Sequence, residues 1–489
     1  MTSDQPNRVK TIFLVVPQGF AARYLLQTDI FPTLRDSGHR IVLLTPEEAH
    51  KALAESSPDN VSWEKLETEK AQAYIENKPG QRFLRQVRFY VLNKKADLAS
   101  IDDHYEVFLA ENKNCGIGER LSIMTSRLLI NLLRSSAVLR KLLLAIEAKL
   151  YNPGFHEELF AKYKPELVVT TSFGNVGESI DFFLIREAKT HGVKSVTVFL
   201  SWDNPTSKGM GGALPDNVIT WTEVMKKEII SYHDFPADRI SVGGVAHFDI
   251  YARKDQLPSR DEIFSKFGLD KKRKLLLFGT KSPVSYPWNP DIVRIIGSAI
   301  DEDKFIEPCQ LLVRLHPLHY SGKMNNVAGQ EIMRAYHQHE ENYEHVHINQ
   351  PDVRDSAMRH DMPKSEISDL AGILNSSDIL VNMVSTLTIE AALLDVPIVN
   401  VSFEGDPKRK IHPRQNIDYD IRQCHNQRVI KTGGVSMARD EADLIESINR
   451  YLENPSLHAE ERNIIREQEC GPNKGSAGTT IANQIISLL

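Results

Sequence analysis

The chain has 489 residues and a net charge of −6, with 41% hydrophobic and 25% charged residues. These values indicate an ordinary globular protein of two or more domains, and the acidic balance excludes a general affinity for nucleic acid. The four cysteines are far apart and show no CxxC spacing, which favours reduced thiols over a disulfide framework. No apolar run reaches the roughly 18 residues of a membrane span. We therefore expect a cytoplasmic protein.

The first part of the chain alternates apolar runs with helical patterns. The runs that predict buried parallel strands are 11–16, 40–44, 166–171, 195–200 and 217–221, with a further segment at 239–245. Gly19 follows the first run, at the carboxyl end of a strand, where open α/β sheets bind their ligands and where a glycine lets a ligand approach the backbone. The alternative for Gly19 is a plain turn.

Residues from about 63 to 150 break this alternation and are predicted to be helical. Between Arg82 and Lys149 there are 12 Lys/Arg and 7 Asp/Glu, a local charge of +5 in an acidic chain. Leucines recur from Leu121 to Leu150 among basic residues. Such a segment lies on an anionic membrane surface in some proteins. In the alternative interpretation, the leucines are core and the arginines are solvated.

A second α/β series follows a charged segment, Tyr251 to Arg273, which carries Pro258 and is interpreted as a link between domains. Its predicted strands are 274–279, 310–315, 345–348, 379–381 and 398–401, and its last predicted helices are near 440–453 and 476–489. We therefore predict an α/β protein with two Rossmann-like domains that face a cleft. The predicted boundaries are 1–250, with the helical insertion at about 63–150, then 251–475 and a C-terminal helix at 476–489.

The segment from Ser376 to Val401 is the most informative part of the second series. It predicts a strand, a polar turn, a helix and a second strand, with Ser385 and Thr386 at the start of the helix. Hydroxyl groups there, with free backbone N–H groups and the positive end of the helix dipole, make an anion site. Glu390 lies about one turn further on and is suited to bind ribose hydroxyls. The alternative for Glu390 is a buried carboxylate that caps its own turn.

Four stretches of the chain resemble a known group of proteins: Trp202–Gly209, Gly243–Asp249, Arg314–Pro317 and Ser385–Pro397. They resemble glycosyltransferase-like proteins of the GT-B fold that are related to CDP-glycerol glycerophosphotransferases and to UDP-N-acetylglucosamine 2-epimerases. Glycerophosphotransferase relatives tend to carry an acidic residue before the serine pair, where this chain has Asn382, Met383 and Val384. The helical stretch 63–150 lies outside the resemblance.

The resemblance implies transfer of a sugar from a nucleotide-diphosphate donor to a hydroxyl of a glycan or lipid-linked acceptor, in the synthesis of cell-surface glycans or glycolipids. It also implies that no metal or other cofactor is needed, because protein groups hold the diphosphate. The first domain would handle the acceptor and the second the nucleotide-sugar. With the basic insertion, this predicts a cytoplasmic enzyme with peripheral contact at the inner face of an anionic membrane.

The same residues suggest the chemistry. A departing nucleoside diphosphate needs positive charge or N–H donors. His316 ends a buried strand before Pro317, and Lys281 follows another strand, so both are candidate donors. The alternative for His316 is a strand-end histidine that is bonded to the backbone. Strand alternation favours a structural role for Arg314. The acceptor hydroxyl needs a general base from the first domain. Asp203 is the first candidate, with a cap of its own turn as the alternative, and Glu178 is the second.

Other functions stay open at this point. Several histidines cluster between His337 and His360, but their loop is polar, no cysteine joins them, and no carboxylate stands at a defining interval, so no metal site is predicted. A non-hydrolysing sugar-nucleotide epimerase would use the same fold and the same nucleotide site. The long helical stretch favours a transferase, because an epimerase has no second substrate to hold. A non-catalytic nucleotide-sugar binding protein is the third possibility.

Overall fold

The computed structural model describes residues 8–46, 58–93, 99–112, 116–174, 180–320, 324, 326–354, 358, 361–406 and 408–489. This part of the chain forms two compact units. The first contains the described residues up to His247, together with Met358, Asp361 and Gly471–Leu489. The second contains the other described residues from Phe248 to Cys470.

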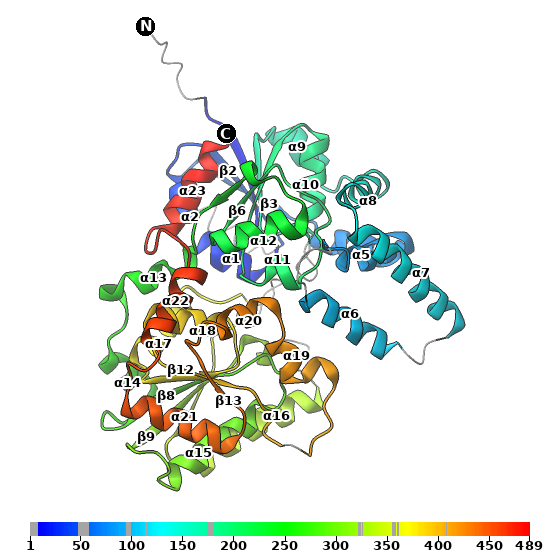
Figure 1. Ribbon diagram of the computed structural model, residues 1–489. Coiled ribbons are helices and arrows are strands. Elements are labelled where there is room, and N and C mark those ends of the chain that lie inside the picture. The colour runs from blue at the N-terminus through cyan, green and yellow to red at the C-terminus, as the bar shows by residue number, and fades with distance from the viewer. Residues whose placement is uncertain are drawn as a thin grey trace. The chain divides into compact units, whose positions relative to one another are not determined.

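A parallel sheet of seven strands forms the centre of the first unit, in the order β3-β2-β1-β4-β5-β6-β7 (Figure 1). The strands are β1 (Thr11–Val15), β2 (Arg40–Thr45), β3 (Val61–Lys65), β4 (Leu167–Thr170), β5 (Lys194–Val198), β6 (Asn217–Thr220) and β7 (Ile240–Val242). Every residue of β1 and β4 is buried. Helices cover both faces of such a sheet, which is why these strands read as unbroken apolar runs.

The helices that pack on this sheet include one from the end of the chain. They are α1 (Gly19–Leu26), α2 (Ile30–Arg35), α9 (Glu157–Tyr163), α10 (Asp181–Thr190), α11 (Asn204–Ser207), α12 (Glu223–His233) and α23 (Ala477–Ser487). α23 packs against α2, closely enough that a Cβ at Gly478 would lie 3.0 Å from the Cβ of Asp29. Gln484 Nε2 donates a hydrogen bond to Val242 O at 3.1 Å. The C-terminal helix therefore completes the first unit.

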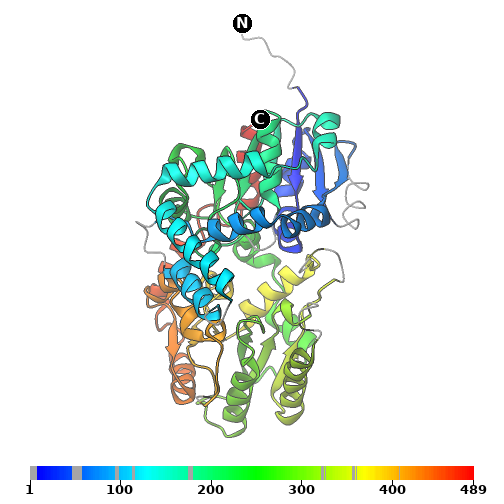
Figure 2. The ribbon, with the colours of Figure 1, turned by 90° about the vertical axis from the view of Figure 1, so that its right-hand side faces the viewer.

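The helical insertion consists of α4 (Thr68–Asn77), α5 (Pro79–Phe89), α6 (Ala99–Glu111), α7 (Ile117–Arg134) and α8 (Ala137–Leu150). Figure 2 shows these helices, coloured blue to cyan, beside the first sheet. The predicted start near residue 63 is wrong, because 63–65 belong to the edge strand β3, which pairs in parallel with β2. Helices α5 to α8 share a small apolar core that includes Val87, Ile130 and Leu143, whereas Ala71 and Ile75 of α4 belong to the core of the first sheet.

The leucine-rich helices α7 and α8 each carry two apolar faces. Leu133 and Leu143 are buried in the core of the insertion, as the core interpretation predicts. A second set of apolar side chains is 45–80% exposed: Ile117, Leu121, Met124, Leu128 and Leu132 on α7, and Val138, Leu142, Ile146 and Leu150 on α8. The basic residues also divide, because Arg140 is buried and pairs with Asp234. The core interpretation accounts for the buried apolar residues and the membrane-surface interpretation for the exposed ones, so neither accounts for both.

A parallel sheet of six strands forms the centre of the second unit, in the order β10-β9-β8-β11-β12-β13. The strands are β8 (Lys274–Gly279), β9 (Cys309–Arg314), β10 (Val346–Asn349), β11 (Ile379–Asn382), β12 (Ile398–Val401) and β13 (Ser436–Ala438). The helices are α13 (Asp249–Ala252), α14 (Arg260–Phe267), α15 (Asn289–Asp301), α16 (Val327–Asn342), α17 (Ser365–Ser376), α18 (Thr386–Leu393), α19 (Ile417–Ile421), α20 (Cys424–Ile430), α21 (Glu441–Glu453) and α22 (Ala459–Glu469). The segment interpreted as a link contains α14, which packs against α17 within this unit.

The prediction of two Rossmann-like α/β domains with a helical insertion in the first is confirmed. Both sheets are entirely parallel among the described strands, and each strand pair joins residues in a single register. Among the described residues, no helix is both long and apolar enough to cross a membrane.

Candidate active site

The strand order of the second sheet marks the place where a ligand is expected. From β8 the chain moves to β9 on one side, and β11 lies on the other side, so the order reverses between β8 and β11. Open α/β sheets bind ligands at the carboxyl ends of the strands beside such a reversal. Lys281 follows β8 and Ser385 follows β11, so two of the predicted site residues stand at this point.

The start of α18 is held by a dense set of hydrogen bonds. Ser385 Oγ accepts from Leu387 N at 3.2 Å, and Ser385 N donates to Thr388 Oγ1 at 3.3 Å, which forms a capping box. Asn382 Nδ2 donates to Thr388 Oγ1 at 3.0 Å, and its Oδ1 accepts from Asn400 Nδ2 at 2.5 Å. The Ser385 hydroxyl therefore acts in the cap of the helix, whose first residue is Thr386.

Close packing places this helix end beside β8. A Cβ at Gly279 would lie 2.2 Å from the Cδ2 of Leu387, so the side chain of Leu387 in the first turn of α18 packs directly on the end of β8. This contact places the N-terminus of α18 at the strand reversal.

Glu390 is 6% exposed and lies on α18. Its Oε2 accepts a hydrogen bond from the hydroxyl of Tyr251 on α13. The carboxylate thus has a partner from another element of the second unit. The sequence does not predict this partner, because Tyr251 stands 139 residues before Glu390.

His316 lies two residues after the end of β9 and is partly buried. Its backbone N–H donates to Thr280 Oγ1 at 2.8 Å, which fixes it to the end of β8. Its Nδ1 accepts from Leu318 N at 3.1 Å. Because Nδ1 is an acceptor, the neutral ring carries its proton on Nε2, which makes that nitrogen a donor. His316 therefore offers an N–H donor near the end of β8.

Two cationic side chains at the carboxyl ends of β8 and β9, Lys281 and Arg314, are ion-paired. Lys281 Nζ contacts Asp420 Oδ2 of α19, and its backbone N–H donates to Asn289 Oδ1 at 2.9 Å. Arg314 is 8% exposed and pairs with Glu366 of α17. The structural role predicted for Arg314 is confirmed. To bind a phosphate, Lys281 would have to break its ion pair with Asp420.

In the first unit, Asp203 follows β5 and precedes α11. Its Oδ1 accepts from Ser201 Oγ at 2.5 Å, and its Oδ2 accepts from Ser207 Oγ at 2.9 Å. Lys208 Nζ lies 3.1 Å from Oδ2. The carboxylate is 17% exposed, so it is held within its own turn and still reaches the surface.

The other predicted residues of the first unit are Gly19 and Glu178. Gly19 is buried at the start of α1, just beyond β1. Glu178 lies outside the described residues. Asp181, which the sequence analysis missed, is fully buried at the start of α10. Its Oδ2 accepts from Thr171 N at 3.0 Å and from Thr171 Oγ1 at 2.9 Å, and burial raises the pKa of this carboxyl.

Comparison with known proteins identifies the fold. No protein family model and no curated protein matches the chain. The structure of S. aureus MnaA with UDP is 11% identical, with a TM-score of 0.53 over 98% of each chain. UDP-GlcNAc 2-epimerase from Neisseria meningitidis, bound to UDP-GlcNAc, is 12% identical, with a TM-score of 0.51 over 98% of this chain and 100% of that one. A glycosyltransferase from Rickettsia africae ESF-5 is 12% identical, with a TM-score of 0.48 over 98% and 99% of the chains. The chain has the GT-B fold.

The GT-B fold predicted from the four sequence stretches is therefore confirmed. At 11–12% identity the likeness extends to the fold alone. The roles of individual residues rest on the geometry of each unit.

A metal site does not emerge from the geometry of the described residues, in which no three His, Cys, Asp or Glu side chains gather closely enough to hold an ion. His345 directly precedes β10 and His347 lies within it, and His337 and His339 lie on α16. His360 lies outside the described residues. That the protein needs no metal stays a prediction.

Proposed function

We propose that this GT-B protein is a glycosyltransferase that moves a sugar from a nucleotide-diphosphate donor to a hydroxyl acceptor. The observation that carries the proposal is the pair of N–H donors at the strand reversal of the second sheet. The N-terminus of α18 is fixed there by the bond from Asn382 to Thr388, and His316 offers Nε2–H beside the end of β8. Donors fixed in this way stabilise the charge that develops on a departing diphosphate.

The proposed roles follow from these positions. At the start of α18 the N–H groups of Ser385, Leu387 and Thr388 are bonded within the first turn. Phosphate is therefore bound by the Thr386 N–H and the Ser385 hydroxyl at the positive end of the helix dipole, and Glu390 binds ribose hydroxyls. His316 donates to the leaving group, and Lys281 joins it when its pair with Asp420 opens. Asp203, or Glu178, removes the proton of the acceptor hydroxyl. No metal is assigned a role, because helix N–H groups and basic side chains hold the diphosphate.

We expect Glu390→Ala and His316→Ala to weaken nucleotide-sugar binding about tenfold each, since each removes one hydrogen-bonding group. Isothermal titration calorimetry with UDP and UDP-GlcNAc, the ligands of the MnaA and Neisseria meningitidis structures, measures this. Glu341→Ala and His337→Ala on α16 are matched controls that should leave affinity unchanged. Unchanged affinity in both site variants contradicts the assignment, and affinity that EDTA abolishes contradicts metal independence.

The second candidate function is sugar-nucleotide epimerisation. It is favoured by the UDP-GlcNAc 2-epimerase of Neisseria meningitidis, which shares the fold along the whole chain. The helical insertion α4–α8 favours a transferase, because an epimerase has no second substrate to hold. Incubation with UDP-GlcNAc alone, followed by proton NMR, distinguishes the two. Inversion at C2 without an acceptor identifies an epimerase, whereas a transferase leaves the sugar unchanged until an acceptor is added.

We further propose that the helical insertion lies on an anionic membrane, which would present a lipid-linked acceptor to the enzyme. Five apolar side chains form one stripe along α7, with spacings of three and four residues, and are 56–80% exposed. Arg120 and Arg127 lie on one flank of that stripe. An apolar stripe with a basic flank is the pattern of a helix that lies in the membrane interface.

Replacing Met124, Leu128 and Leu132 by serine should weaken binding to anionic vesicles at least tenfold, because three side chains no longer enter the interface. Sedimentation with vesicles of phosphatidylcholine and phosphatidylglycerol measures it. The matched control replaces Val284, Ile306 and Val327, three similarly exposed apolar residues of the second unit, by serine. If the wild-type protein never sediments with vesicles, or if both triple variants lose binding equally, the membrane proposal is wrong and a soluble acceptor is indicated.

A further inference from the structure

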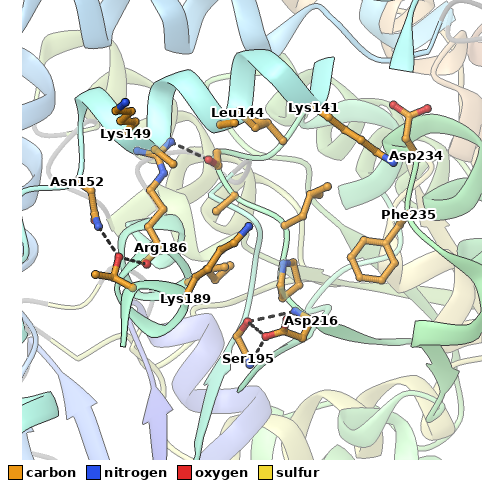
Figure 3. A pocket seen from close by; sticks show the side chains of 18 of the residues that line it. Lys141, Leu144, Lys149, Asn152, Arg186, Lys189, Ser195, Asp216, Asp234 and Phe235 are labelled. Atoms are coloured by element: carbon orange, nitrogen blue, oxygen red, sulfur yellow. Dashed lines mark hydrogen bonds between the residues drawn. The ribbon is translucent and has the colours of Figure 1, made fainter. Parts of the chain in front are cut away.

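The first unit contains a cavity of about 600 Å³ that none of the candidate active-site residues lines. Figure 3 shows it beneath α8, with Lys141, Leu144 and Lys149 on that helix and Lys189 pointing toward the cavity from α10. Ser195 is at the start of β5 and Asp216 directly precedes β6. The cavity is thus at the amino ends of these strands, opposite the carboxyl ends where Asp203 stands.

The cavity is lined by uncompensated positive charge. Five cationic side chains and two carboxylates line it. Asp216 Oδ2 accepts from Ser195 N and Oγ at 2.8 and 3.0 Å, and Asp234 is held by Arg140 at 2.6 and 2.8 Å. The side chains of Lys141, Lys149, Lys189 and Arg239 form no ion pair or hydrogen bond with any residue that the structure describes. An anion is the complement of this rim.

The floor of the cavity is apolar and too large for a small ion. Leu144, Ala148, Ile185, Leu214 and Phe235 contribute to it. Cavities of roughly 300–1,000 Å³ with apolar walls and a few polar groups accommodate molecules of drug size. The ligand that fits therefore has an anionic group and an apolar body.

The face of α8 that lines the cavity is next to the exposed apolar face of the same helix. Lys141, Ala145 and Lys149 form one row along the helix, and Leu142, Ile146 and Leu150 form the next row, rotated by about 100°. The first row lines the cavity and the second is exposed. A molecule in the cavity with its charge at the lysines can thus continue along an apolar surface.

We propose that this cavity binds an anionic phospholipid, with its phosphate at Lys189, which points into the cavity, and part of an acyl chain against the floor. Lys141 and Lys149, about 12 Å apart along α8, add positive charge at the two ends of the rim. The bilayer beneath α7 and α8 supplies the lipid. The site is separate from the reacting groups, so it anchors the protein and takes no part in sugar transfer. The lipid site goes beyond the proposed function, because its existence does not depend on which reaction the protein catalyses.

The test uses the full-length protein and dihexanoyl-phosphatidic acid, a soluble short-chain probe, in isothermal titration calorimetry. We expect saturable binding of one molecule per chain, weakened about tenfold or more in two variants. Ala148→Trp fills the cavity and keeps every charge. The triple variant Lys141→Gln, Lys149→Gln and Lys189→Gln keeps the cavity and removes its charge. The control Lys65→Gln, Lys164→Gln and Lys227→Gln removes the same charge elsewhere in the first unit and should bind as wild type.

Each other outcome overturns the proposal. The absence of saturable binding rules out the site. Wild-type affinity in Ala148→Trp shows that surface charge, and not the cavity, attracts the probe. If inorganic phosphate binds at the cavity as tightly as the lipid does, the site serves free phosphate and not a lipid. Because none of these measurements uses a nucleotide-sugar, failure here leaves the proposed function untouched.

Discussion

Asp203→Asn should lower turnover by about 10²-fold or more while nucleotide-sugar binding persists. Asparagine keeps the size of the side chain and one acceptor oxygen, so Ser201 or Ser207 still has a partner, but it cannot take a proton from the acceptor hydroxyl. Steady-state kinetics with an acceptor that supports sugar transfer gives the turnover, and calorimetry with the nucleotide-sugar gives the donor affinity. A fall in kcat with unchanged donor affinity and unchanged Tm is the signature of a lost base.

The control separates chemistry from the stability of the turn. Ser207→Ala removes a donor that holds the Asp203 carboxylate at 2.9 Å and leaves the carboxylate in place. If Asp203 only stabilises its turn, Asp203→Asn and Ser207→Ala will lower Tm and activity together. If Asp203→Asn is active and Glu178→Gln is inactive, the base is Glu178. Activity in both contradicts both assignments.

Glu147→Ala should destabilise the first unit by about 3–5 kcal/mol, because it leaves two buried guanidinium groups without their carboxylate. Glu147 on α8 is fully buried, and its oxygens lie 2.9 Å from Arg88 Nε and 3.0 Å from Arg186 Nη2. Gln81 Nε2 also donates to it at 2.9 Å. This network joins α5 and α8 of the insertion to α10 beside the sheet. Thermal unfolding should show a fall in Tm of about 10 °C.

Two comparisons test the cause of that loss. Glu158→Ala, at an exposed position of α9, should leave Tm nearly unchanged. The triple variant Glu147→Leu, Arg88→Met and Arg186→Met removes all three charges together and should be more stable than Glu147→Ala, since no buried charge stays unpaired. A triple variant less stable than Glu147→Ala would contradict the electrostatic explanation.

The same network predicts the direction of a pH effect. Burial by itself would raise the pKa of Glu147, but the charges of Arg88 and Arg186 hold it below its ordinary value of 4.5. A folded-state pKa below the unfolded one contributes stability above the unfolded value, and this contribution is lost as the pH falls through the folded value. Denaturation of the wild type should therefore steepen below about pH 4.5, and Glu147→Ala should lack that part of the pH dependence.

The central strands and the start of α18 were predictable from the sequence. β1 and β8 are buried on both faces and read as continuous apolar runs, a pattern that few other structures produce. The edge strands β3 and β13 were missed, because an edge strand is short and half exposed, and Ser62, Glu64 and Lys65 resemble a helix or loop. The Ser-Thr start of α18 was predictable because a helix cap depends only on residues next to each other.

The partners of the candidate site residues were decided by the tertiary structure. Glu390 with Tyr251, and Lys281 with Asp420, each join residues 139 positions apart, and no local pattern predicts such a pair. Helical periodicity also shows that α7 and α8 have apolar faces, but not which one faces the core. The packing of Leu133 and Leu143 against α5 decides that, and it leaves Leu128 and Leu142 exposed. Local residue pattern specifies elements and caps, whereas long-range contacts form only when the chain folds and brings distant residues together.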